Sequence, residues 1–103
     1  MLERLIDMVS YQPDSIVSKS LTKSSAGSVT LFAFAGGQEL SEHTVPHDAL
    51  AYLVDGSAAL GVGGSTYEAA AGDLVRLPAN VPHSVRAQGP SKMLLIMLRD
   101  PKD

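Results

Sequence analysis

Apolar residues follow a helical spacing only at the start of this chain, and the spacing of β-strands elsewhere. The helical positions i, i+3, i+4 and i+7 are occupied by Leu2, Leu5, Ile6 and Val9. This pattern predicts a short helical extension within residues 1–12, which Pro13 ends. Because a helix of about two turns is only marginally stable alone, we expect it to lie on another part of the protein.

The remainder of the chain is a series of short β-rich segments separated by turn residues. These segments are 15–23, 28–34, 49–54, 57–62, 66–73, 74–78, 84–87 and 92–98. Gly, Pro, Asn or Asp stands between them, and the pairs Asp55-Gly56 and Gly63-Gly64 are typical of hairpin turns. Such regular spacing predicts an all-β sandwich or barrel, built as a single domain over residues 1–103.

Two of the predicted strands, 49–54 and 92–98, are apolar on both faces. A sheet with one face in water would alternate polar and apolar residues instead. Either one face lines a barrel while the other packs on the N-terminal helix or a second subunit, or both are central strands of a sandwich.

Composition and charge are those of a globular protein, with 45% apolar and 18% charged residues. The net charge of −3 and the absence of a Lys/Arg cluster argue against nucleic-acid binding. No apolar run approaches the ~20 residues of a membrane helix, and the acidic first segment is unlike a signal peptide. We therefore expect a cytoplasmic protein that does not bind membranes. The absence of cysteine excludes disulfides, zinc ribbons and thiol nucleophiles.

All three histidines of the chain, His43, His47 and His83, lie in two proline-containing segments. Pro78 and Pro82 flank the bend before His83 and restrict its backbone, which would pre-organise a ligand position. Imidazole is the commonest metal ligand, and without cysteine a transition-metal site must use nitrogen and oxygen. The histidines are therefore candidate metal ligands, although a lone histidine in a loop usually has no such role.

Two motifs in this sequence resemble those of the cupin family. In the first motif, five residues separate Gly37 from His43, and the segment from Tyr52 to Gly56 follows. The second motif consists of Gly72, Asp73, Pro78 and His83. The resemblance covers roughly residues 28–98 and implies a small jelly-roll β-barrel of the conserved-barrel (cupin 2) type. It also implies a homodimer and a divalent metal ion, such as Fe, Mn, Ni or Zn, held inside the barrel.

The sequence departs from the family pattern at two of the four usual ligand positions and at one further motif position. Val45 and Ala49 stand where the first motif has its second histidine and its glutamate, and Ala87 replaces the asparagine of the second motif. Only His43 and His83 are retained. His47 could replace a lost ligand, and a carboxylate from Glu39 or Glu42 would give the two-histidine, one-carboxylate set of non-haem iron enzymes.

A ligand pocket is predicted beside the histidines. Ala49, Ala51 and Leu53 share strand parity with His43, and with Val45 they would line this pocket unless they form ordinary core. Two functions follow. One is a metal-dependent enzyme, such as a dioxygenase or isomerase, acting on a small apolar or aromatic molecule, with no catalytic residue identified. The other is a non-catalytic small-molecule-binding or sensor module with a degenerate metal site.

Overall fold

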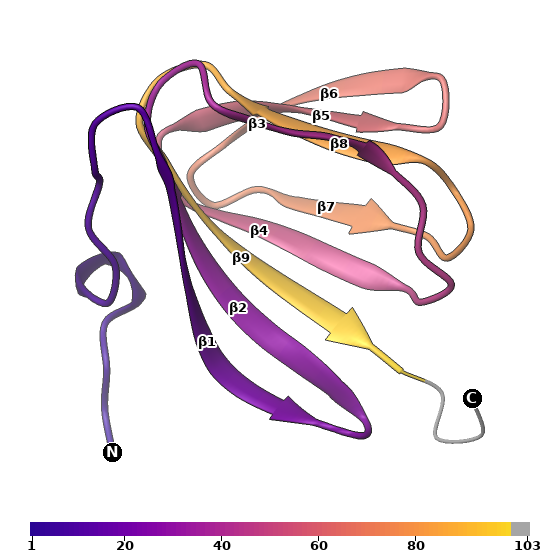
Figure 1. Ribbon diagram of the computed structural model, residues 1–103, viewed down its shortest axis with the longest axis horizontal. Coiled ribbons are helices and arrows are strands. Elements are labelled where there is room, and N and C mark those ends of the chain that lie inside the picture. Colours follow the sequence, from indigo (N-terminus) through magenta and orange to yellow (C-terminus); the bar gives the residue numbers. More distant parts are fainter. Residues whose placement is uncertain (100–103) are drawn as a thin grey trace.

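The computed structural model describes residues 1–99, which form two antiparallel sheets facing each other (Figure 1). The first sheet has the order β1 (Ile16–Ser24), β2 (Gly27–Phe34), β9 (Ser91–Leu98), β4 (Ala49–Asp55) and β7 (Leu74–Leu77). The second has the order β3 (Glu39–His43), β8 (His83–Ala87), β5 (Ser57–Val62) and β6 (Ser65–Ala70). This arrangement is a jelly roll and confirms the predicted all-β fold.

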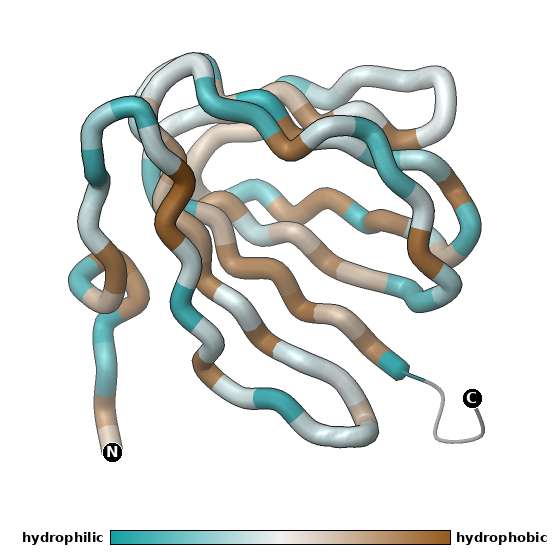
Figure 2. Tube along the Cα trace, viewed as in Figure 1, coloured by the Kyte–Doolittle hydropathy of each residue, from teal (hydrophilic) through white to brown (hydrophobic). Residues whose placement is uncertain are grey.

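The two sheets converge at one end and spread apart at the other, where the β1–β2 hairpin leans away from β3 and β8 (Figure 1). The side chains that are fully buried between them include Phe34, Leu53, Leu60, Leu77 and Met93. Hydrophobic residues are concentrated along β9, whereas β3 is largely hydrophilic (Figure 2). The core therefore lies between the central strands, and β3 forms a polar edge of the second sheet.

The outer face of the first sheet is covered in part by the N-terminal segment. Val9 packs there on Leu31 and Ala33, all three of them buried. This contact explains part of the outer apolar face of β4 and β9, because Val54 and Leu94 join the cluster around this segment while the inner face lines the core. The N-terminal residues thus supply part of the cover, β4 and β9 are also internal strands of their sheet, and cover by a second subunit stays a prediction.

The predicted N-terminal helix is wrong in extent, because only a single 3-10 turn forms, η1 (Leu5–Asp7). Arg4 at its N-cap makes no side-chain capping bond. Leu5 and Val9 pack on the sheet, but Leu2 and Ile6 are 81% and 45% exposed. A helix of two turns would need a continuous apolar stripe on the sheet, and these contacts do not provide one. No helix in residues 1–99 is long and apolar enough to cross a bilayer.

Candidate metal centre

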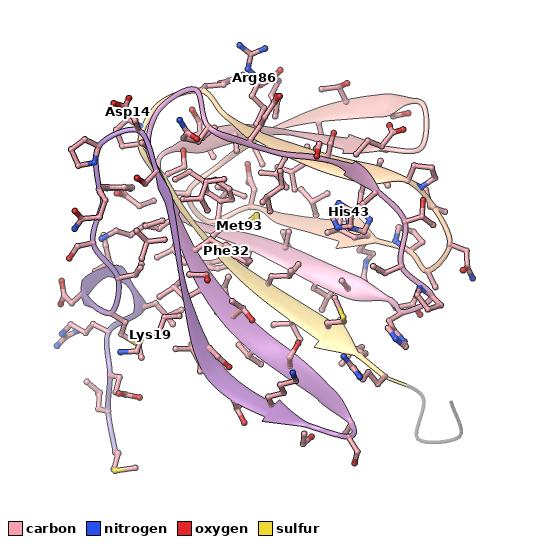
Figure 3. The ribbon with its side chains drawn as sticks, viewed as in Figure 1. Asp14, Lys19, Phe32, His43, Arg86 and Met93 are labelled. Atoms are coloured by element: carbon pink, nitrogen blue, oxygen red, sulfur yellow. The ribbon has the colours of Figure 1, made fainter. Side chains whose placement is uncertain are left out.

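His43 and His83 lie side by side, although they come from separate strands. His43 ends β3, His83 begins β8, and the two residues are direct partners in the antiparallel pairing of these strands. Their ring centroids are 4.4 Å apart, with the ring planes at 70°. The His43 side chain extends from the end of β3 toward the first sheet (Figure 3). The fold thus brings together the two histidines that the sequence motifs single out.

A backbone hydrogen bond selects the tautomer of His43. Its Nδ1 lies 2.9 Å from the carbonyl oxygen of Ser41, which can only accept, so Nδ1 carries the proton in the neutral ring. The lone pair is therefore on Nε2, the nitrogen that remains available to bind a metal. Metal-binding histidines are commonly oriented by such a bond from the second ring nitrogen.

The environment of His83 keeps its imidazole neutral. The residue is only 5% exposed. Burial, assisted by the neighbouring His43, lowers the pKa of His83 below its ordinary value of 6.5. Its Nδ1 is buried and makes no hydrogen bond of normal geometry, and a backbone contact of the His83 ring with Val81 offsets the lowering of the pKa only in part. A buried polar atom without a partner is uncommon, and a neutral ring is the form that binds metal, so the neutral His83 ring suits a metal ligand.

The loop before His83 is held in an unusual backbone conformation. Asn80 has a φ of 63°, a left-handed value that asparagine tolerates better than most residues. The Asn80 amide donates to the Val45 carbonyl at 2.8 Å, and the Gly63 amide donates to the Pro82 carbonyl at the same distance. These bonds fix the loop on both sides, so His83 enters β8 from a defined position.

The other predicted ligands do not join this pair. Among residues 1–99, no group of three or more His, Asp or Glu side chains is placed to hold a metal ion. His47 is half-buried, and its Nδ1 has no hydrogen-bond partner. Glu39 and Glu42 are exposed on β3. The protein donors at this centre are therefore two imidazoles, and other positions around an ion would be filled by water or a bound molecule.

Comparison with known proteins identifies the family. The family described as "Cupin domain" matches residues 30–98, most of the chain. The chain belongs to the cupin family. This assignment agrees with the jelly-roll topology and with the location of His43 and His83 on adjacent strands.

Several solved structures are similar to this cupin along nearly its whole length. A conserved protein of unknown function from Streptococcus pyogenes has 28% identity and a TM-score of 0.92, covering 97% of this chain and 88% of that one. A cupin superfamily protein from Desulfitobacterium hafniense has 27% identity and a TM-score of 0.91, covering 97% and 94%. A cupin 2 conserved-barrel domain protein from Leptotrichia buccalis has 36% identity and a TM-score of 0.88, covering 91% and 46%. No curated protein matches the sequence.

The four residues predicted to line a pocket differ in their surroundings. Ala49, Ala51 and Leu53 are buried in the core between the sheets, and Val45 is half-buried in the segment after β3. Of the four, Ala49 alone also lines a hollow of about 290 Å³ at the ends of β4, β7 and β9. The walls of this hollow are Asp48, Ala49, Leu50, Arg76, Leu77, Pro78 and Leu98. A pocket formed by all four predicted residues stays a prediction.

The strand that carries His43 was missed from the sequence, where residues 36–49 look turn-like. Its exposed positions are polar, and a bulge between Leu40 and His43 interrupts the pairing with β8. The sequence gives no period-2 signal for this strand, because the bulge places Leu40 and His43 opposite the buried Val85 and His83, whereas Glu39 lies opposite the exposed Arg86. The orienting role of Ser41 had no signal either, because it is played by a backbone carbonyl.

Proposed function

We propose that this cupin binds a divalent metal ion through the imidazoles of His43 and His83. The observation that carries the proposal is the contact of two rings on paired strands, with centroids 4.4 Å apart. The imidazole nitrogens favour Fe, Ni or Zn, and the water positions are compatible with Mn. A metal ion bound here would supply Lewis-acid chemistry to a ligand that reaches its open positions.

The proposed ligand is a small apolar or aromatic molecule bound next to the metal. Interior residues that pack against the core between the sheets are apolar and only partly buried, among them Phe32, Leu40 and Leu95. Val45 and Ala49 replace two polar ligands of the family pattern, which makes these surroundings less polar. Apolar walls with a few polar groups are typical of small-molecule sites.

A second candidate is a binding or sensor module without turnover. It is favoured by the absence, within residues 1–99, of a three-ligand acidic and histidine group. Both candidates bind the metal through the same histidine pair. They differ in whether the bound ligand undergoes a chemical reaction.

The proposal is tested by elemental analysis of the full-length protein, purified without an affinity tag and without chelator. We expect bound divalent metal in the wild type and its loss in the His43→Ala/His83→Ala double variant. His47→Ala is the matched control, and we expect it to keep its metal because His47 lies outside the pair. A metal-free wild type, or a double variant with unchanged metal content, would refute the proposal.

A further inference from the structure

The two segments that carry the histidines are joined by more than the pairing of β3 with β8. Residues 44–48 connect β3 to β4, and residues 78–82 connect β7 to β8. One link is the backbone hydrogen bond from the Asn80 amide to the Val45 carbonyl. In the other, the Ala79 amide nitrogen donates to Oδ1 of the Asp48 carboxylate at 2.8 Å. Of these two links, only the second uses a side chain, so only that link can be removed by substitution without altering the backbone.

The backbone of Asp48 is itself anchored to the first sheet. Its carbonyl accepts a hydrogen bond from the Leu98 amide at 2.9 Å, at the end of β9. The next residue, Ala49, begins β4 and pairs with both Leu77 and Met97. The Asp48 carboxylate therefore extends from a fixed point of the first sheet to the loop that leads into His83.

We propose that Asp48 is a positioning residue for the histidine pair. Its carboxylate holds the 78–82 loop at Ala79, four residues before His83, and so maintains the placement of the His83 ring beside His43. The acceptor oxygen of Asp48 lies at hydrogen-bond distance from the Ala79 amide, and this link crosses between the two segments. The inference rests on the proposed metal site, and Asp48 acts on that site without binding the metal.

The experiment is a calorimetric titration of the full-length, untagged protein with Zn²⁺. We expect Asp48→Ala to weaken zinc binding about 10-fold, the lower end of the effects seen for groups that orient metal ligands. Asp48→Asn keeps an acceptor oxygen at the same place, so its affinity should stay within about 2-fold of wild type. Asp48→Glu keeps the charge but moves the oxygens, so its affinity should lie between those of the other two variants.

Asp73→Ala is the matched control. The Asp73 carboxylate likewise accepts from a backbone amide, that of Ala70 at 2.9 Å, and it is also exposed. This bond lies within the turn between β6 and β7 and joins no segment that carries a histidine. We expect a loss of thermal stability similar to that of Asp48→Ala, with zinc affinity unchanged, which separates positioning of the site from general destabilisation.

The possible outcomes separate this inference from the proposed function. Wild-type zinc affinity in Asp48→Ala and Asp48→Glu would overturn the inference and leave the metal site intact. A loss in Asp48→Asn as large as in Asp48→Ala would also overturn it, because the carboxylate would then act as a ligand or a charge. Absence of zinc binding by the wild type would overturn the proposed function together with the inference.

Discussion

At the scale of single residues, the site depends on the tautomer of His43 and on the neutral form of His83. The Ser41 carbonyl fixes the proton of His43 on Nδ1, and burial disfavours the charged form of His83. The His43 ring, with its centroid 4.4 Å from that of His83, adds to the lowering of the His83 pKa. The same features that prepare the rings for a metal make the metal-free fold sensitive to acid.

This sensitivity gives a prediction for the pH dependence of stability. The lowered pKa of folded His83 means that the unfolded chain binds a proton near pH 6.5 while the folded chain does not. The free energy of unfolding should therefore be unaffected by this group above pH 6.5 and should fall as the pH drops from there toward the pKa of folded His83. Urea unfolding at several pH values, with chelator present, should show a flatter profile for His83→Gln. Parallel profiles for the two proteins would contradict the assignment.

At the scale of elements, the N-terminal segment is fastened to the sheet by polar groups as well as by packing. The Tyr11 hydroxyl donates to the Asp55 carboxylate at 2.6 Å, and Lys92, which is buried, donates to the Ile6 carbonyl. The Lys92 ammonium also lies 5.0 Å from the centroid of the Tyr11 ring, within the range of a cation–π contact. Burial and the nearby Asp55 raise the pKa of Tyr11, so its hydroxyl remains a donor.

Removal of this hydroxyl should loosen the segment. We expect Tyr11→Phe to lower the free energy of unfolding by about 1.5 kcal/mol, since a hydrogen bond to a charged group is lost and Asp55 loses its partner. Tyr67→Phe is the control, because Tyr67 is half exposed on β6. Urea denaturation of both variants measures the difference, and equal stabilities would show that the Tyr11–Asp55 bond contributes nothing measurable.

The elements also show what local sequence patterns can predict. Strands such as β2, β4 and β9 were predicted because apolar residues and hairpin turns mark them in any context. The N-terminal helix was overpredicted because the path of this segment depends on distant partners. Tyr11 bonds to Asp55, 44 residues away, and Ile6 accepts from Lys92, 86 residues away. The strand β3 was missed because its exposed residues are polar and its ladder is irregular.

At the scale of the whole molecule, the fold converts two distant motifs into one site. The histidine pair could be predicted because the family resemblance places both residues, whereas the link from Asp48 could not, since its partner amide lies 31 residues away. The homodimer and the cytoplasmic location stay predictions. The exposed Leu74 and Leu98 of the first sheet would suit contact with a second copy.

The most direct test of the account is X-ray absorption spectroscopy of the zinc-loaded, untagged protein, because it counts the imidazoles bound to the metal. We predict two imidazole nitrogens at about 2.0–2.1 Å from zinc, with oxygen ligands completing the shell. The His43→Ala and His83→Ala single variants should each retain one. A wild-type spectrum without imidazole scattering, or one left unchanged by both variants, would contradict the central claim that His43 and His83 together hold the metal.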